Sequence, residues 1–592
     1  MLSFIKNEVA AAAQTLFGQT IDANAIQLNP TPPEFKGDCT IVVFPFTKFS
    51  KLGPEPTATA IGNQLKLQLP TLADFNVVKG FLNLTLSDEF WLNQFQSKFN
   101  QESVHQITPN DKRVMVEYSS PNTNKPLHLG HVRNNLLGHA IAEILGAAGN
   151  HVIKANLIND RGIHICKSMI AWQKFGNGET PASASMKGDH LVGKYYVLFD
   201  QAYKKEIAQL ISEGKTEDEA KAQAPIIIEA QNMLRDWEDG NEAVLTLWKT
   251  MNEWVYAGFN ETYAKMGVSF DKMYYESQTY LLGKDIIKEG LESGVFFQKP
   301  DNSVWIDLTA DGLDQKLVQR SDGTSVYITQ DIGTAQKKYD DFNIDQSIYV
   351  VGNEQDYHFK VLQLICKKLN KPYADGIYHM SYGMVELPTG KMKSREGTVV
   401  DADDLMKEMI ESAKTITESA GKDQGFSERE KSELYNDIGL GALKFFLLKI
   451  DPKKKMLFNP EESIDFHGFT GPFVQYTHAR IQSILRKAND ENSHASINLS
   501  ETHSLNNEEK ELVMALLQLN NKIKEAADNL SPAIIANYAY QIAKSFNTFY
   551  AEHSVLKAEN TQKEFRLALA TYTAKVLKYT LHLIGINAPN KM

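Results

Sequence analysis

The chain has 592 residues, a formal net charge of −11, and hydrophobic and charged shares of 42% and 23%. These values are ordinary for a soluble globular protein, and the length suits three or more domains of about 100–200 residues each. No apolar run approaches the ~20 residues of a membrane span, so no membrane partner is expected. The three cysteines form no Cys-x-x-Cys pair, which leaves disulfides and a structural zinc site unsupported. The first ten residues lack a secretory signal core, so we expect a cytoplasmic protein.

Residues 1–105 are predicted to form a small α/β domain. After a helical start, the sequence predicts strands at 40–46 and 77–86 and a helix near 89–99. A second sheet domain begins in residues 106–165. There the sequence predicts a strand, a helix and a second strand, at 113–118, 130–148 and 152–157. This β-α-β order is typical of a parallel sheet, so the predicted fold class is α/β.

The remaining residues predict a divided sheet domain followed by helices. Residues 166–300 carry little strand character and are predicted to be a mostly helical insertion. Strand patterns resume in residues 301–405, at 303–308, 325–329, 346–351 and 379–387. Residues 406–465 predict a helical stem. Residues 466–592 predict an all-α bundle, with helices near 472–488, 507–528, 531–551 and 561–585.

The segment from Glu117 to His131 carries the strongest functional signal. It reads Glu-Tyr-Ser-Ser-Pro-Asn-Thr-Asn-Lys-Pro-Leu-His-Leu-Gly-His and connects the predicted strand to the helix. His128 and His131 flank Gly130 at a helix N-terminus, where backbone N–H groups and the helix dipole favour an anion. A histidine near a helix start is often only a cap. The strand–turn–helix context and the preceding Lys125 favour nucleotide binding instead.

Two basic clusters stand out against the acidic balance of the whole chain, and nucleic-acid binding depends on such local clusters. The loop 390–397 places Lys391, Lys393 and Arg395 between two glycines, where they could close over phosphates. The alternative is a solvent-exposed loop without a binding role. This alternative is less favoured because the same chain also contains the histidine turn. Lys453-Lys454-Lys455 is the second cluster, and a solvated loop and a nucleic-acid contact both stay open there.

These motifs resemble the two signatures of class I aminoacyl-tRNA synthetases. His128-Leu-Gly-His131 is similar to the first signature, and Lys391-Met-Lys-Ser-Arg395 to the second. Over essentially its whole length the chain resembles the arginyl-tRNA synthetase family. The segments that carry this narrower resemblance are Glu117-Tyr-Ser-Ser-Pro-Asn122, Thr470-Gly-Pro-Phe-Val-Gln-Tyr-Thr-His-Ala-Arg480 and Leu583-Ile-Gly-Ile-Asn-Ala-Pro-Asn-Lys-Met592.

The resemblance implies a role for each predicted domain. Residues 106–165 and 301–405 would form a Rossmann-like catalytic domain, and residues 166–300 its connective insertion. Residues 1–105, with Gly80-Phe-Leu-Asn-Leu84, resemble the additional tRNA-contacting domain of the family, and 466–592 its anticodon-binding domain. Another enzyme of the class is not supported, because neither zinc-binding cysteines nor an editing insertion is evident.

The family resemblance also implies the reaction and its ligands. L-arginine and ATP would give arginyl-adenylate and pyrophosphate, and the arginyl group would then pass to the 3′-terminal adenosine of tRNA(Arg). Mg²⁺ is expected with ATP, without a dedicated protein site, and a monomer is expected. The implied catalytic residues are Lys125, His128, His131, Lys391, Lys393 and Arg395. The implied ATP-binding residues are His128, Gly130, His131, Lys391 and Met392.

The second signature departs from the usual pattern at one position. Lys393 stands where serine is usual, and Ser394 where the class usually has its second lysine. A lysine just before the first signature is thought to replace it in many arginyl enzymes, and Lys125 occupies that place. Whether Lys125 or Lys393 takes the role stays open.

An arginine substrate requires a carboxylate that faces a planar guanidinium. By resemblance, Asp331 and Glu276 match positions around that group, with Tyr327 packed on the stem of the substrate. Ordinary alternatives are a helix-capping Asp331 and a Glu276 that ends a strand. The positions implied at the amino and carboxylate ends are Ser120, Asn122 and Gln355, assisted by Glu117. Those implied for tRNA are Lys453, Lys454, Lys455 and Tyr476.

Two functions of other kinds remain as alternatives. A small nucleotidylyltransferase shares the His-x-Gly-His turn but needs neither the helical bundle nor the distant basic loop. A non-catalytic tRNA-binding relative would keep the fold. Both signatures, Lys125 and the acidic residues of the arginine pocket are present in this chain, which favours the enzyme.

Overall fold

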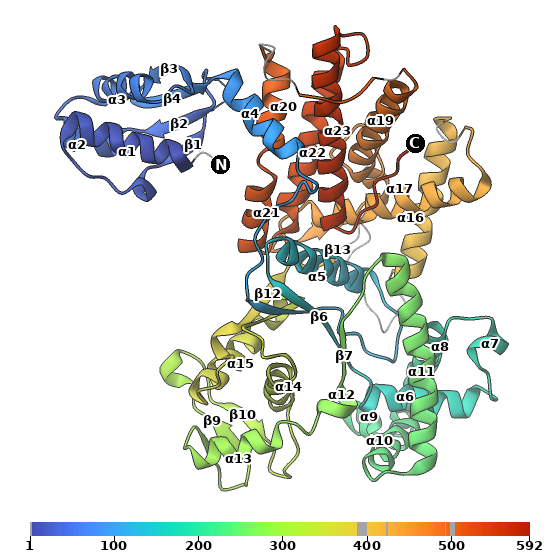
Figure 1. The fold of residues 1–592 in the computed structure, drawn as a ribbon. Coiled ribbons are helices and arrows are strands. Elements are labelled where there is room, and N and C mark those ends of the chain that lie inside the picture. The colour runs from blue at the N-terminus through green and yellow to red at the C-terminus, as the bar shows by residue number, and fades with distance from the viewer. Residues whose placement is uncertain (1–2, 33, 387–399, 422–423, 492, 498–503) are drawn as a thin grey trace.

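The computed structural model describes residues 3–592 except 33, 387–399, 422–423, 492 and 498–503. An N-terminal domain lies to one side of a central parallel sheet, and a helical bundle covers one end of that sheet (Figure 1). None of the helices in the described part of the chain has the length and apolar character that a membrane span needs.

The N-terminal domain is a four-stranded antiparallel sheet in the order β1-β2-β4-β3. Its elements are α1 (Ser3–Phe17), β1 (Leu28–Pro30), β2 (Cys39–Val42), α2 (Thr47–Ser50), α3 (Pro54–Gln68), β3 (Leu72–Val78), β4 (Phe81–Leu86) and α4 (Asp88–Phe99). The single strand predicted at 77–86 is wrong, because the chain reverses at Lys79 and Gly80. Both have left-handed φ values, 48° and 81°, as a tight hairpin turn requires.

The central sheet has five parallel strands in the order β12-β11-β5-β6-β7. The strands and the first crossover helix are β5 (Arg113–Glu117), α5 (Leu129–Ala147), β6 (His151–Ile158), β7 (Lys272–Tyr275), β11 (Gln346–Gly352) and β12 (Ile377–Tyr382). The chain leaves β5 toward β6 on one side and later returns to β11 on the other. The carboxyl ends of β5 and β11 therefore flank a topological switch point, where ligands bind in open α/β sheets.

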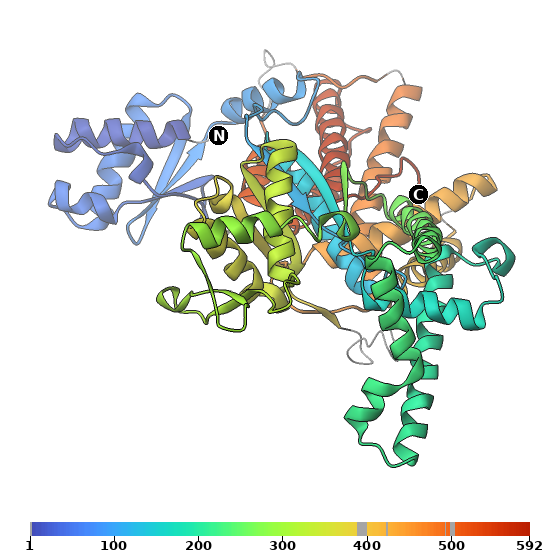
Figure 2. The same ribbon diagram turned by 90° about the horizontal axis from the view of Figure 1, so that it is seen from below.

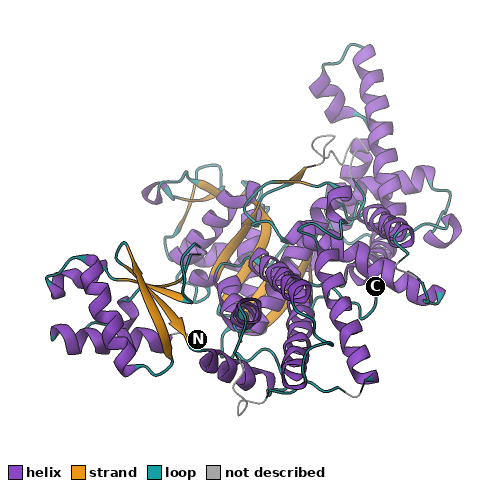
Figure 3. Cartoon of the chain, turned by 90° about the horizontal axis from the view of Figure 1, so that it is seen from above, coloured by secondary structure: helices purple, strands orange, loops and turns teal. Residues whose placement is uncertain are grey.

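The segment between β6 and β7 is helical, as predicted, and projects from the body of the molecule (Figures 2 and 3). It contains α6 (Ile163–Phe175), α7 (Pro181–Ala184), α8 (Gly188–Ser212), α9 (Glu217–Gln223), α10 (Pro225–Glu238) and α11 (Glu242–Met266). Residues 166–300 also hold β7 and the short helix α12 (Glu276–Thr279) that follows it. The range predicted as an insertion thus includes an edge strand of the central sheet.

A second excursion separates β7 from β11. It holds α13 (Lys284–Glu292) and a three-stranded antiparallel sheet, β8 (Phe296–Gln298), β9 (Val304–Ile306) and β10 (Lys316–Gln319). The strand predicted at 303–308 is β9, which belongs to this small sheet. The strand predicted at 325–329 is wrong, because Tyr327 begins the helix α14 (Tyr327–Phe342). Ile328, Ile332 and Ala335 are buried at helical spacing, and this packing overrides the β propensity of Val326 and Tyr327.

The C-terminal part is helical, as predicted. It contains α15 (Asp356–Lys368) at the sheet, then β13 (Val385–Glu386), α16 (Ala402–Ser419), α17 (Glu428–Leu448), β14 (Met456–Leu457), α18 (Pro460–Ser463), α19 (Gly471–Asp490), α20 (Asn507–Leu516), α21 (Leu519–Asp528), α22 (Pro532–Glu552) and α23 (Asn560–Leu583). The helix predicted at 507–528 is two helices, α20 and α21. Asn506 and Glu509 form a reciprocal capping box at the start of α20.

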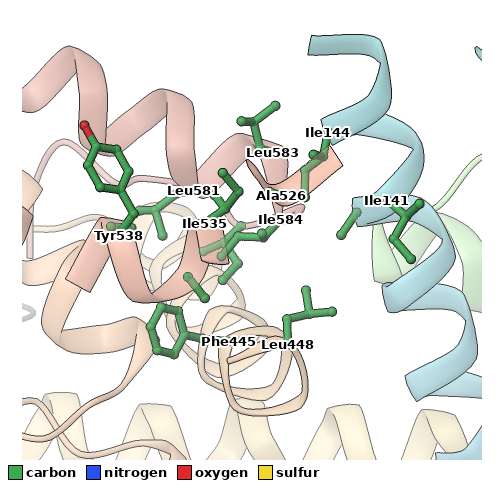
Figure 4. Packing of buried hydrophobic residues seen from close by; sticks show 14 of the residues in the cluster. Ile141, Ile144, Phe445, Leu448, Ala526, Ile535, Tyr538, Leu581, Leu583 and Ile584 are labelled. Carbon is green, nitrogen blue, oxygen red and sulfur yellow. The ribbon is translucent and has the colours of Figure 1, made fainter. Parts of the chain in front are cut away.

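One hydrophobic core joins the bundle to the central sheet. Ile141 and Ile144 of α5 lie beside Leu583 and Ile584, which follow one another at the end of α23 (Figure 4). Phe445 and Leu448 of α17 belong to the same buried cluster, as do Ala526, Ile535, Tyr538 and Leu581. Burying one such side chain contributes about 1.5–3 kcal/mol to stability. The shared core therefore holds α5 firmly against the bundle.

Candidate active site

The histidine turn forms the N-terminus of α5. His128 is the residue that caps the helix: its Nδ1 accepts a hydrogen bond from Gly130 N at 3.1 Å, and its own N donates to His131 Nδ1 at 3.2 Å. The two rings lie 3.9 Å apart between centroids. The capping interpretation of these histidines is therefore correct, and it leaves the outer nitrogen of each ring to carry the proton.

Both histidines are neutral at pH 7. Burial, together with the charge of Lys125, lowers the pKa of His128 to about 4. Burial, then His128 and Lys125, hold the pKa of His131 well below its ordinary range. A neutral imidazole whose Nδ1 accepts a backbone hydrogen bond has its Nε2–H as a donor. The turn thus places two ring donors at the positive end of the helix dipole, which suits phosphate oxygens.

The chain leaves β5 through two left-handed residues, Ser119 (φ 76°) and Ser120 (φ 45°). Non-glycine residues in this region cost about 1–3 kcal/mol each and persist where neighbours hold them in place. Asn134 Oδ1 accepts from Ser119 N at 2.5 Å, Asn156 Oδ1 accepts from Ser120 N at 3.1 Å, and the Tyr263 hydroxyl lies 2.7 Å from Ser119 Oγ. This support places Ser120 at an exposed corner above the sheet.

Sequence reasoning did not identify Asn134, Asn156 or Tyr263. They come from α5, β6 and α11, and only the fold brings them to one backbone turn. Asn134 also donates from Nδ2 to Val350 O of β11 at 2.7 Å. One buried amide therefore joins the two strands at the switch point to the strained turn.

Asn122 and Glu117 lie at different depths in the site. Asn122 is half-buried in a stretch that pairs with the end of β6, through Thr123 N to Asn159 O at 3.0 Å and Asn159 N to Pro121 O at 2.9 Å. The carboxylate of Glu117 is buried, and its Oε2 lies 2.5 Å from Nζ of Lys338, whose side chain is 1% exposed. Lys338 belongs to α14, so this ion pair fastens α14 onto the sheet.

Glu276 lines a cavity of about 570 Å³, together with Tyr327 and Arg161. Tyr327, 73% exposed, opens α14, and Asp331 follows one turn later on the same helix face. Asp331 Oδ2 lies 2.6 Å from His358 Nε2. Asp331 is not a helix cap, because Val326 precedes the first turn of α14. Glu276 directly follows the last residue of β7, in agreement with the ordinary alternative that it ends a strand.

Burial is the main cause that raises the pKa of Glu276 to about 7; the charge of Arg161 opposes this increase, and the carboxylates of Asp160 and Asp331 add to it. The Arg161 guanidinium stacks 3.8 Å from the centroid of the Tyr280 ring and pairs with Glu238 at 2.7 Å. A cation brought to Glu276 would restore its charged form. Glu276 therefore favours a cationic group beside it.

Asp160 fixes the start of α12, where Glu276 lies. Its carboxylate accepts from Ser277 N at 2.8 Å, from Ser277 Oγ at 2.7 Å and from the Tyr256 hydroxyl at 3.0 Å. Sequence reasoning missed Asp160 and Arg161. A signal was present, because both come directly after a strand of a parallel sheet, at its carboxyl end.

Gln355 lies after β11, in the turn that precedes α15, and its side chain is exposed. Ser120 and Asn122 follow β5, the neighbouring strand. The three positions that sequence reasoning assigned to the amino and carboxylate ends of the substrate thus meet at one edge of the sheet.

The second signature falls outside the described residues: Lys391, Met392, Lys393 and Arg395 all lie within 387–399. The structure does describe the segment that follows. Leu129 N donates to Val400 O at 3.0 Å, and Ala402 N donates to Leu127 O at 3.0 Å. Residues 400–402 are therefore paired with the histidine turn. Beside them lies a cavity of about 220 Å³, whose lining includes Lys125, His128 and Asp401.

The candidate tRNA residues lie on two surfaces. Lys453, Lys454 and Lys455 are exposed, and the buried Arg133 of α5 holds their backbone by donating to Pro452 O at 3.1 Å and Lys454 O at 3.0 Å. This loop borders a groove of about 610 Å³ between β12 and the helices α21 and α22. Tyr476 is half-buried on α19.

One group of residues in the described part of the chain has ligand atoms close enough to hold a metal ion. These atoms, from Asp189, His190 and Asp403, lie within 4.8 Å of one another. The ammonium group of Lys187 contacts both carboxylates. The protein itself thus supplies a cation to this cluster.

Comparisons with known proteins identify the family of this chain. Residues 94–459 match the family model described as "tRNA synthetases class I (R), catalytic domain", and residues 474–592 match the "DALR anticodon binding domain". The arginine–tRNA ligase of Bacteroides thetaiotaomicron is 55% identical over 589 residues, covering 98% of each chain. That of Flavobacterium psychrophilum is also 55% identical, covering 99% of this chain and 98% of the relative.

Solved structures give the same result. The arginyl-tRNA synthetase of Thermus thermophilus superposes with a TM-score of 0.81 at 25% identity, covering 100% of both chains. The arginyl-tRNA synthetase of Plasmodium falciparum, at 19% identity and a TM-score of 0.76, shares the fold over 100% of this chain and 98% of its own. With matching models for both major parts and full-length relatives above half identity, the chain belongs to the class I arginyl-tRNA synthetase family.

Proposed function

We propose that this protein is an arginine–tRNA ligase, which activates L-arginine with ATP and transfers it to the 3′-terminal adenosine of tRNA(Arg). One observation carries the proposal beyond family membership. The histidine turn at the N-terminus of α5 and the cavity that contains Glu276 both lie at the carboxyl edge of the same parallel sheet. An adenylation site needs both features side by side, one for ATP and one for a cationic amino acid.

In the first step, an oxygen of the arginine carboxylate attacks the α-phosphorus of ATP, and the bond to the bridging oxygen of pyrophosphate breaks. His128 and His131 donate from Nε2 to phosphate oxygens, and Gly130 lets the adenine approach the backbone. Lys125 stabilises the charge that develops on the leaving pyrophosphate. Fixed donors of this kind act chiefly by positioning and by charge stabilisation.

The second signature completes the ATP site in this proposal. Lys391, Lys393 and Arg395 supply further positive charge to the phosphates, and Met392 contacts the nucleotide. The resemblance of this segment to the class I signature supports these assignments. ATP enters as its Mg²⁺ complex, with the metal ion held mainly by the phosphates.

In the arginine site, Asp331 and Glu276 pair with the guanidinium, and Tyr327 packs on the aliphatic stem. Ser120, Asn122 and Gln355 hold the amino and carboxylate ends. Glu117 assists indirectly. Its buried ion pair with Lys338 fixes α14, which bears Tyr327 and Asp331.

This site discriminates by leaving polar groups unpaired when the wrong amino acid binds. Lysine lacks the planar fork, and citrulline lacks the positive charge, so either would leave a carboxylate of the site without its partner. Discrimination by a factor of about 10⁴ is attainable in this way, so no editing site is needed.

For tRNA, we propose contacts along one side of the molecule. Residues 1–105 and the bundle 466–592 hold the tRNA at its two ends, in line with the anticodon-binding family match over 474–592. Lys453, Lys454 and Lys455 contact the phosphate backbone, and Tyr476 contacts a base. The protein acts as a cytoplasmic monomer, and sedimentation of the free chain and of its tRNA complex tests the monomeric state.

Arginine-dependent exchange between ATP and pyrophosphate tests the proposal directly. It is measured with and without tRNA(Arg), with lysine and citrulline in place of arginine as controls. Exchange with arginine alone among the amino acids supports the proposal. Exchange that appears only in the presence of tRNA would show, in addition, that bound tRNA completes the active site. Bound tRNA without any exchange would instead identify a non-catalytic relative and overturn the proposal.

A further inference from the structure

A cluster of charged side chains joins the helical insertion to the start of α16. Lys187 precedes α8, and Asp189 and His190 lie in its first turn, while Asp401 and Asp403 open α16. Lys187 Nζ donates to Asp403, and it lies 3.3 Å from Asp189 Oδ2. His190 Nε2 lies 3.4 Å from Asp401 and 3.2 Å from Asp403. Figure 1 shows α11, which bears Thr262, rising toward the lower end of α16.

Lys187 is the cation on which this cluster depends. The side chain of Asp189 is fully buried, and within the described residues neither of its carboxylate oxygens accepts a hydrogen bond. Lys187 is 16% exposed and also donates to Thr262 Oγ1 at 2.5 Å, and Thr262 in turn donates to Asp403 at 3.2 Å. Removing one partner from a buried ion pair leaves a charge without compensation, which is strongly unfavourable.

The cluster is connected to the ATP site through two residues of backbone. Asp401 caps α16 by accepting from Asp403 N at 2.8 Å and from Asp404 N at 3.2 Å. On either side of Asp401, Val400 and Ala402 pair with Leu129 and Leu127 of the histidine turn. In the sequence, Val400 directly follows the segment that contains the second signature. The cluster therefore fixes the point where that segment rejoins the first signature.

We propose that Lys187 is a positioning residue for the adenylation step: by holding Asp403 and Asp189 together, it keeps residues 400–402 paired with the histidine turn. The inference rests on the proposed function. It adds that the helical insertion, which contributes no proposed ligand to ATP, controls how well the two signatures act together. A loss of Lys187 should therefore weaken the use of ATP and spare arginine binding, since no residue of the cluster lines the cavity that contains Glu276.

The test compares Lys187→Met with wild type in pyrophosphate exchange, with ATP and arginine varied separately. We expect kcat/KM for ATP to fall about tenfold, mainly through KM for ATP, with KM for arginine changed less than twofold. Lys204→Met is the matched control on the same helix, because Lys204 pairs with Asp200 one turn away and is 63% exposed. We expect it to match wild type.

A second pair of variants separates positioning from general stability. Thr262→Val keeps the side-chain volume but removes the hydroxyl shared by Lys187 and Asp403, and should raise KM for ATP about threefold. Asp403→Asn, added to Lys187→Met, removes a carboxylate charge that has lost its lysine partner and should recover at least a third of the decrease in kcat/KM. Melting temperatures of all variants are measured alongside.

Three results would overturn the inference: Lys187→Met behaving like wild type, equal rises in KM for ATP and for arginine, or no recovery in the double variant. If Lys187→Met does not fold, Thr262→Val decides the matter by the same comparison of KM values. Exchange by the wild-type protein is measured first. Its absence would overturn the proposed function, whereas wild-type exchange with an inert Lys187→Met change would overturn this inference alone.

Discussion

His358 Nε2 lies 2.6 Å from Asp331 Oδ2, so the carboxylate assigned to the substrate guanidinium already has a partner in the free protein. His358 comes from α15 and Asp331 from α14, and the two side chains are 27% and 35% exposed. A bound arginine must share Asp331 with His358 or displace it. The pair also holds the carboxylate in one orientation, which reduces the ordering that binding requires.

Replacing Asp331 should affect arginine selectively. We expect Asp331→Asn to raise KM for arginine about 100-fold, corresponding to about 3 kcal/mol for a truncated charge pair, with KM for ATP nearly unchanged. Asp340→Asn on the exposed side of α14 is the matched control. Steady-state exchange kinetics provide both constants. A normal KM for arginine in Asp331→Asn would remove this residue from the substrate site.

Glu276 should make arginine binding depend on pH. Its pKa is raised to about 7, chiefly by burial, so below pH 7 the carboxyl is increasingly protonated and cannot pair with a guanidinium. KM for arginine should rise as pH falls below about 7, approaching tenfold per pH unit, and this limb should be missing in Glu276→Gln. An identical pH profile for the two proteins would contradict the assignment.

The same shift predicts a change in stability of the free protein. A carboxyl whose folded pKa lies above its unfolded value stabilises the fold less as pH rises through the folded pKa. At pH 8 the charged Glu276 is therefore costly, and Glu276→Gln should melt at a higher temperature than wild type. At pH 5 this difference should largely disappear, which thermal unfolding in two buffers can establish.

The histidine turn and Lys125 should each contribute strongly to the rate. His131→Ala and Lys125→Ala remove one fixed donor or charge apiece, and each should lower kcat for exchange by about 10²–10³, or about 3 kcal/mol. Near-normal turnover in Lys125→Ala, together with a large loss in Lys393→Ala, would assign the role of the missing signature lysine to Lys393. Single-turnover formation of arginyl-adenylate distinguishes these cases from slow product release.

Both ring protonation states can be observed directly. Because the pKa of His128 lies near 4 and that of His131 well below its ordinary range, neither ring should titrate between pH 5.5 and 8. Nuclear magnetic resonance of histidine-labelled protein reports this, with His128→Gln and His131→Gln used to assign the signals. A transition near 6.5 in either residue would contradict the neutral-donor arrangement.

The three lysines at 453–455 should act on tRNA through charge alone. Changing all three to glutamine should reduce the salt dependence of tRNA binding by about one unit of slope for each phosphate that the loop no longer neutralises. Lys288, Lys360 and Lys367, exposed residues between β7 and β12, provide a control with the same change in charge. Equal slopes for wild type and the 453–455 variant would place this loop outside the tRNA interface.

Patterns within short segments were sufficient for much of the fold. The strand before Glu117, the helix that begins at His128 and the helical character of the C-terminal part all followed from hydrophobic spacing and turn residues. The hairpin at Lys79-Gly80 was missed although its turn residues were visible. The stretch at 325–329 was misassigned, because β-branched and aromatic residues favour a strand locally while packing of α14 decides for a helix.

The family resemblance and the two signature segments could be recognised in the linear chain, because their chemistry depends on residues a few positions apart. The contacts that hold the site became visible only in the folded protein: Asn134 on the strained turn, Lys338 on Glu117, His358 on Asp331 and Lys187 on Asp403. Each of these contacts joins two different elements of the chain. Local propensity does not encode such pairings, because they form only when the packing of the common core brings distant segments together.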